Sequence, residues 1–90
     1  MSERTVAVGS AQGLHARPAS IFTEAAKKSP VKVTVGRPGG APVDAVSMLL
    51  VMTLMVKQGE EVVLRAEGAG AQEALDELAE LLARDLDAAP

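Results

Sequence analysis

The 90-residue sequence contains no cysteine, no tryptophan, no tyrosine and one phenylalanine, Phe22. Without cysteine, the chain can form no disulfide, no thiol nucleophile and no thiolate zinc site. Modules that bind single-stranded nucleic acid stack bases on aromatic side chains, so a single phenylalanine argues against nucleic acid as a partner. The only histidine, His15, cannot form a cluster of metal-binding imidazoles by itself. We therefore expect chemistry that uses one imidazole, hydroxyls, carboxylates or the backbone, with no metal and no cofactor.

Long hydrophobic segments are also missing. The longest nearly apolar stretch covers residues 45–56 and is interrupted by Ser47 and Thr53, whereas a helix that spans a bilayer needs about 20 residues. Residues 1–15 show no basic start followed by an apolar run and a cleavage site, as a secretory signal would. We expect a cytoplasmic protein without membrane insertion. The length and the apolar content of 48% predict one globular domain over residues 1–90.

Charge is distributed unevenly along the chain, whose formal net charge is −3. Residues 1–59 contain seven Lys and Arg against three acidic residues, and residues 60–90 contain two Arg against nine acidic residues. Such a basic half is typical of a surface that docks an acidic partner or an anionic ligand. An ordinary solvated surface explains the same charges equally well.

The spacing of apolar residues predicts four strands and three helices in the order βαββαβα. Alternating apolar residues predict strands at 4–8, 31–35, 41–45 and 61–67, the last with Val62, Leu64 and Ala66 facing the core. Apolar residues three and four positions apart predict helices at 16–28, 47–54 and from 71 through Leu86. The face expected in the core consists, in the first helix, of Pro18, Ile21, Phe22, Ala25 and Ala26, and in the last helix of Ala71, Ala74, Leu75, Leu78, Leu81, Leu82 and Leu86. Pro42 indicates an edge strand, since it lacks a donor for the ladder. Strands with one apolar face need helices on that face only, so we expect an α+β open-faced two-layer sandwich with an antiparallel sheet.

His15 lies where a glycine-containing loop meets the start of the first helix. A lone histidine is usually a structural residue, but backbone N–H groups at a helix start have no intrahelical acceptor. Because that end carries about half a positive charge, it favours a neutral imidazole, which can act as a nucleophile, and would stabilise an anion attached to the ring. Arg17 adds a guanidinium that can pair with such an anion. This combination indicates reversible phosphoryl attachment.

Residues 13–20, GLHARPAS, resemble the active-site segment of the histidine-containing phosphocarrier proteins (HPr) of the bacterial phosphoenolpyruvate:sugar phosphotransferase system. The chain length, the order of elements and the serine and methionines of residues 47–52 also fit this family. The resemblance implies a sheet order of 1-4-2-3 and a stoichiometric carrier rather than an enzyme. It implies that His15 accepts a phosphoryl group through Nδ1 from enzyme I, which takes it from phosphoenolpyruvate, and passes it to the IIA components of sugar permeases. Arg17 would pair with the phosphate, which the helix start at Ala16 and Arg17 would cradle.

Ser47 is expected to cap the helix at 47–54, and capping alone is enough to explain a serine there. The resemblance implies a second role, in which a kinase phosphorylates this serine to regulate catabolism. The neighbouring sequence departs from the family at Val46, where a basic residue is frequent, and at Leu50 and Met55, where glycines are frequent. These departures leave the regulatory role of Ser47 open.

The same helix carries Met48, Leu49 and Met52, which are expected partly in the core and partly in a docking patch beside His15. Enzyme I and IIA components are the expected partners of a monomeric carrier, with a regulatory kinase or a transcription regulator as further candidates. Two alternatives remain for the function. One is a carrier in a regulatory phosphorelay that serves no sugar uptake, and the other is a regulatory binding module of the same fold.

Overall fold

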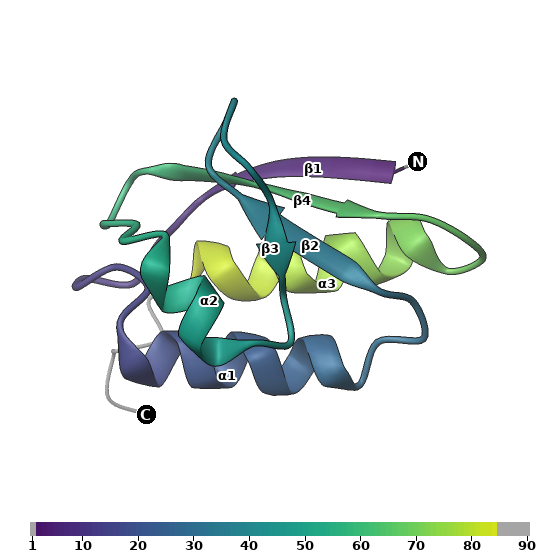
Figure 1. Ribbon diagram of the computed structural model, residues 1–90, viewed down its shortest axis with the longest axis horizontal. Coiled ribbons are helices and arrows are strands. Elements are labelled where there is room, and N and C mark those ends of the chain that lie inside the picture. The colour runs from purple at the N-terminus through teal and green to yellow at the C-terminus, as the bar shows by residue number, and fades with distance from the viewer. Residues whose placement is uncertain (1, 85–90) are drawn as a thin grey trace.

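The computed structural model describes residues 2–84. Its elements are β1 (Ser2–Ala7), α1 (Ala16–Lys27), β2 (Val33–Gly36), β3 (Val43–Asp44), α2 (Met48–Thr53), β4 (Glu61–Ala66) and α3 (Ala71–Ala83). The strands form one antiparallel sheet in the order β1-β4-β2-β3, and all three helices lie on the same side of it (Figure 1). The predicted open-faced βαββαβα sandwich and its 1-4-2-3 sheet order are confirmed.

The two central strands, β4 and β2, supply the buried face of the sheet. Val62, Leu64 and Ala66 alternate inward along β4, as predicted. Val35 of β2 lies opposite Leu64, and both side chains are fully buried. This register follows from the two-residue repeat of side-chain direction in a strand, because a shift by one residue would turn Val33 and Val35 of β2 toward solvent.

Strands β2 and β3 are shorter than the sequence indicated. Val31 lies outside β2 because its N–H donates to the Ser29 hydroxyl at 3.3 Å, which keeps it in the turn after α1. Only Val43 and Asp44 form β3, which is the edge strand expected from Pro42. Beyond Asp44 the chain turns into α2, so the predicted strand 41–45 was too long.

Helix α1 presents a slightly different face to the core than the one predicted. Pro18, Phe22 and Ala26 are buried as expected, but Ile21 and Ala25 are only partly buried. The buried face instead includes Ala19 and Thr23. Thr23 tolerates burial because its hydroxyl donates to the Ser20 carbonyl at 3.1 Å.

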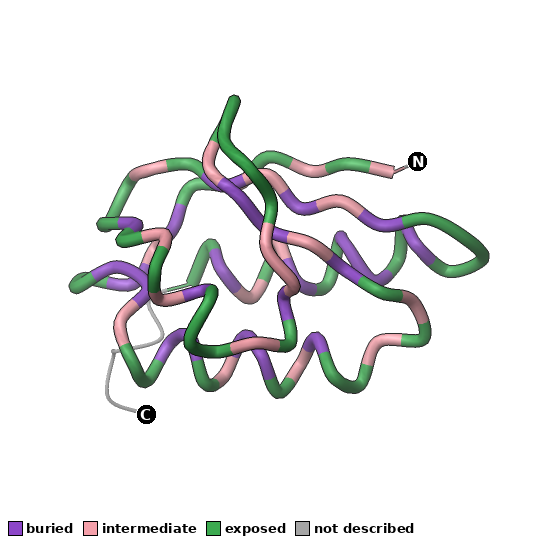
Figure 2. Tube along the Cα trace, in the orientation of Figure 1, coloured by how far each residue is buried: buried purple, intermediate pink, exposed green. Residues whose placement is uncertain are grey.

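The apolar stripe of α3 packs against β1 and β4, and buried residues gather between helices and sheet (Figure 2). Of the predicted stripe, Leu81 is partly buried and Leu86 lies outside the described residues, while the rest is buried: Ala71, Ala74, Leu75, Leu78 and Leu82. Among residues 2–84, no helix has both the length and the apolar content that crossing a bilayer requires.

Candidate functional site

His15 is the N-cap residue of α1. Its backbone is extended, with φ of −82° and ψ of −170°, and its carbonyl accepts the first helical hydrogen bond, from the Ala19 N–H at 3.0 Å. The side chain makes no capping hydrogen bond to the helix and is partly exposed. The imidazole therefore does not occupy the backbone amides of the first turn by capping them.

The first turn of α1 can receive an anion. Pro18 has no N–H, so Ala16 and Arg17 supply the backbone donors between the N-cap and the first helical hydrogen bond. No acidic side chain lies in this turn, so no carboxylate of the turn neutralises the positive end of the helix. Arg17 is exposed, and its guanidinium forms no ion pair with any of residues 2–84.

The loop that leads to His15 is anchored to the chain that follows α2. Leu14 is buried, and its N–H donates to the Val56 carbonyl at 2.9 Å. Gly13 has φ of +73° and lies so close to Val56 that a Cβ would collide with the same carbonyl. Glycine is therefore required here both by backbone conformation and by space. No sequence pattern predicts this contact, since the two segments lie about 40 residues apart.

Ser47 is the N-cap of α2, as predicted from the sequence, and its Oγ accepts from the Leu50 N–H at 3.4 Å. Of the residues expected in a docking patch, Met48 and Leu49 are exposed, with 40% and 74% of their surface accessible. Met52 is partly buried and packs against the core. The structure thus places two of these three side chains at the surface.

Three further apolar residues, which sequence reasoning did not assign to a patch, are exposed around α2. The full apolar patch consists of Val46, Met48, Leu49, Leu50 and Met55. Only Val51 of this six-residue helix is fully buried. A helix this short can bury only one side, so its apolar content was itself a signal that several side chains would be exposed. Helix α2 packs beside α1, close to the end where His15 lies (Figure 1).

Exposed cations lie at both ends of α1 and after α2. Arg17, Lys27 and Lys28 lie on α1 or directly after it, and Lys57 follows α2. Lys27 is paired with Glu24 at 3.4 Å, but both side chains are largely exposed, and such a pair is worth little. The basic surface expected from the charge distribution therefore includes the helix that begins at His15.

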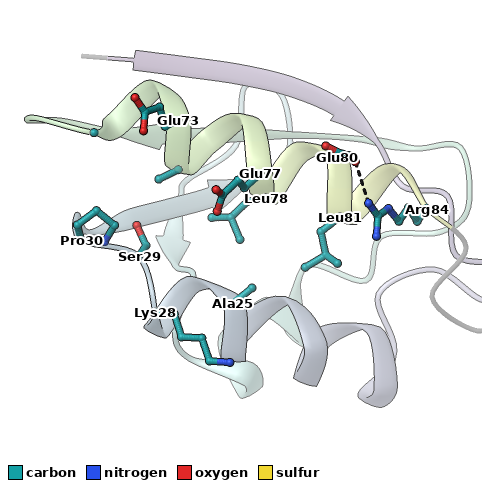
Figure 3. Close-up of a pocket in the computed structure, with 12 residues that line it drawn as sticks. Ala25, Lys28, Ser29, Pro30, Glu73, Glu77, Leu78, Glu80, Leu81 and Arg84 are labelled. Carbon is teal, nitrogen blue, oxygen red and sulfur yellow. Dashed lines mark hydrogen bonds and ion pairs between the residues drawn. The ribbon is translucent and has the colours of Figure 1, made fainter.

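A pocket of about 410 Å³ lies elsewhere, between α3 and the C-terminal half of α1 (Figure 3). Glu73, Glu77 and Glu80 line it together with Lys28. His15 and Arg17 do not border this pocket, so it is not part of the site built around the histidine. Within the described part of the chain, no group of three or more His, Asp or Glu side chains could hold a metal ion.

Comparison with known proteins gives concordant matches. The model of the family described as "PTS HPr component phosphorylation site" matches residues 2–84. The phosphocarrier protein HPr of Streptomyces coelicolor is 51% identical over 90 residues, covering 100% of this chain and 97% of that protein. HPr of Haloferax volcanii is 49% identical over 81 residues, covering 89% and 91%. The crystal structure of HPr-C-His from Thermoanaerobacter tengcongensis superposes with a TM-score of 0.87 at 34% identity, covering 100% of both chains.

These matches confirm the resemblance that residues 13–20 suggested. The family consists of cytoplasmic, non-catalytic carriers, and its partners are enzyme I and IIA components. Of the three functions considered from the sequence, the carrier of sugar phosphorylation is the one confirmed. The chain belongs to the HPr family and is a phosphocarrier of the phosphoenolpyruvate:sugar phosphotransferase system.

Proposed function

We propose that His15 is the residue that carries the phosphoryl group. The observation that supports this most directly is the position of the chain's only imidazole, at the N-cap of a twelve-residue helix whose first turn holds no acid. A phosphoryl group on that ring would lie at the positive end of α1. The backbone N–H groups of Ala16 and Arg17 would donate to its oxygens, and the Arg17 guanidinium would pair with its charge.

In this mechanism Nδ1 of His15 attacks the phosphorus atom carried by phospho-enzyme I. A new N–P bond forms while the bond between phosphorus and enzyme I breaks, and the electron pair of the broken bond stays with enzyme I. The same exchange in the other direction transfers the group to a IIA component. The chain contributes a fixed nucleophile and donors that hold the transferred oxygens, and it needs no general acid because imidazole is a sufficient leaving group.

We propose further that the apolar patch is the surface on which enzyme I and the IIA components dock. Met48 and Leu49 of this patch, together with the partly buried Met52 beside them, would contact both kinds of partner in turn. Methionine suits this task because its flexible, polarisable side chain adapts to different surfaces.

We also propose that the carrier acts as a monomer, since one patch must remain accessible to successive partners. Light scattering at working concentration measures this mass directly.

For Ser47 the geometry supports the capping role. Its Oγ already accepts a helical N–H, and a cap of this kind is worth about 1 kcal/mol without any modification. Phosphorylation by a regulatory kinase would place negative charge beside Met48 and Leu49, where docking partners must approach. Incubation with such a kinase and ATP, followed by measurement of the intact mass of the carrier, would show whether Ser47 is phosphorylated. If it is, a transcription regulator becomes a candidate partner of the phosphorylated carrier.

Reconstitution of the relay tests the central proposal. Enzyme I, phosphoenolpyruvate and a IIA component are incubated with the wild-type carrier or with His15→Ala, and phosphoryl transfer to IIA is followed. The wild type should support transfer, and His15→Ala should abolish it while retaining the circular dichroism spectrum and the thermal midpoint of the folded protein. Transfer through a folded His15→Ala variant would contradict the proposal.

A further inference from the structure

Arg37 follows β2 directly and reaches the far end of α2. Its Nε donates to the Leu54 carbonyl at 2.8 Å, and Nη2 donates to the Met55 carbonyl at 2.7 Å. Nη1 and Nη2 also contact the carboxylate of Glu60, at 3.3 Å each. These two carbonyls lie at the C-terminal end of α2, and the last turn of α2 contains no basic residue. Arg37 therefore supplies, from another part of the chain, the cation that a helix C-terminus favours.

Glu60, which pairs with Arg37, also binds the chain two residues after Met55. Its Oε1 accepts from the backbone N–H of Lys57 at 2.7 Å while it remains paired with Arg37. Residues 54–57 are thus held at one end by the guanidinium and at the other by the carboxylate. We name these two side chains together, Arg37 and Glu60, the brace.

The braced segment contains a residue in an unfavourable conformation. Met55 has φ of +52°, and no other non-glycine residue among those described has a positive φ. For an L-residue with a side chain this conformation costs about 1–2 kcal/mol, so surrounding contacts must hold it. The bond from Arg37 to the Met55 carbonyl is such a contact. Because 74% of the Met55 surface is exposed, packing contributes little to holding it.

The apolar patch and the loop that carries His15 are both connected to residues 54–57. Met55 belongs to the apolar patch, and α2, which carries most of that patch, ends at Thr53 just before the segment. The next residue, Val56, is buried and accepts the hydrogen bond from Leu14, the neighbour of His15. A shift of residues 54–57 would therefore displace the patch and the histidine loop relative to each other.

We propose that Arg37, together with Glu60, positions the apolar patch relative to His15 and thereby controls how well the carrier docks on enzyme I. Arg37 is a positioning residue, because its hydrogen bonds go to two backbone carbonyls and to Glu60 rather than to the histidine. The inference rests on the proposed function, in which His15 is the acceptor and the apolar patch is the docking surface. Its contribution is expected mainly in KM for the carrier rather than in kcat, because the substitution replaces neither the imidazole nor any residue of the first turn of α1.

The test uses Arg37→Lys in the full chain. Lysine keeps the positive charge, but an ammonium group lacks the planar fork that donates to two carbonyls and a carboxylate at once. We expect KM in phosphorylation by enzyme I to rise about 2- to 30-fold, as when a network that supports a binding surface is broken, with kcat nearly unchanged. Amide hydrogen exchange at Leu14 should also accelerate more than exchange at the core amides of β4.

Arg65→Lys is the matched control. The side chain of Arg65 is 40% exposed, as is that of Arg37, and it is paired with Glu3 at 2.7 Å, away from residues 54–57. This variant should keep the wild-type KM and the wild-type exchange rate at Leu14. Glu60→Gln is a milder variant of the brace, since an amide oxygen can still accept from Lys57, and it should move KM in the same direction by a smaller factor.

The outcomes separate this inference from the proposed function. Wild-type KM in Arg37→Lys, or a uniform rise in exchange with KM unchanged, would overturn the positioning role even if His15→Ala is inactive. An increase in KM equal to that of Arg65→Lys would also overturn it, because the effect would then belong to any exposed arginine. Phosphorylation of a folded His15→Ala variant would instead overturn the proposed function. If Arg37→Lys fails to fold, Glu60→Gln decides by the same criteria.

Discussion

Replacing Gly13 with alanine should disturb the contact that places the histidine loop. Gly13 has φ of +73°, and its backbone lies against the Val56 carbonyl. An alanine would be held in a left-handed conformation, and its Cβ would overlap that carbonyl. The loop would have to withdraw from Val56, which would break the 2.9 Å hydrogen bond between the Leu14 N–H and the Val56 carbonyl.

The size of the effect follows from two contributions. The left-handed conformation costs an alanine about 1–2 kcal/mol, and overpacking against backbone that cannot move freely adds about 1–3 kcal/mol. Gly13→Ala should therefore lower the free energy of unfolding by about 2–5 kcal/mol, a large share of the roughly 5–15 kcal/mol typical of a domain. Phosphoryl acceptance from enzyme I should slow as well, because the altered loop carries His15.

Gly39→Ala is a close control. Gly39 has φ of +76°, nearly that of Gly13, but a Cβ there would meet no atom within 4 Å. This variant should show only the conformational cost of about 1–2 kcal/mol and normal phosphoryl acceptance. Urea denaturation of both variants, with m-values checked for constancy, measures the difference. Equal destabilisation by Gly13→Ala and Gly39→Ala would refute the idea that the histidine loop is fixed by close packing against Val56.

Three further predictions concern charge. Ser47→Asp should leave the thermal midpoint nearly unchanged, because aspartate is a good N-cap. It should slow phosphorylation at limiting carrier concentration, because docking would bury the new carboxylate in the interface. Unaltered kinetics would place Ser47 outside that interface. KM for the carrier in the enzyme I reaction should rise with salt, since exposed cations such as Arg17 and Lys27 are screened, and a flat dependence would assign docking to the apolar patch alone. The hydrogen bond from Arg37 lowers the pKa of Glu60 below its usual 4.5, so the folded state binds this proton less readily than the unfolded state. The stabilisation is therefore present above pH 4.5 and is lost as the pH falls through the lowered pKa. The difference in unfolding free energy between wild type and Glu60→Gln should shrink over that acid range, and a difference that stays constant with pH would contradict this prediction.

The sequence was sufficient where local periodicity determines structure. Val62 and Leu64 alternate inward as a half-buried strand must, and Phe22 lies on the buried face of α1. Ser47 was recognised as a cap because a serine there precedes an apolar helical run. The position of His15 at a helix start was likewise a local feature, given by a glycine before it and a proline after it.

What the sequence did not predict depends on contacts between distant segments. The bonds from Arg37 to the end of α2 join residues 17 and 18 positions apart, and no spacing rule indicates them. The left-handed conformation of Met55 was not predicted, because glycine, not methionine, is the usual signal for it. The contact between Gly13 and Val56 is tertiary for the same reason. Exposure of Leu50 was missed because an apolar residue in an apolar helix looks like core until the neighbouring elements are placed.

The chemical identity of the phosphorylated atom tests the account most directly. The ¹⁵N-labelled carrier is phosphorylated with enzyme I and phosphoenolpyruvate, and ¹⁵N–³¹P coupling is measured by NMR on the intact protein. We predict one coupled nitrogen, Nδ1 of His15, with amide shift changes concentrated at Ala16 and Arg17, whose N–H groups would hold the phosphoryl oxygens. A phosphoryl group on any other atom, or one on His15 that leaves both amides unchanged, would contradict the claim that the start of α1 forms the phosphate cradle.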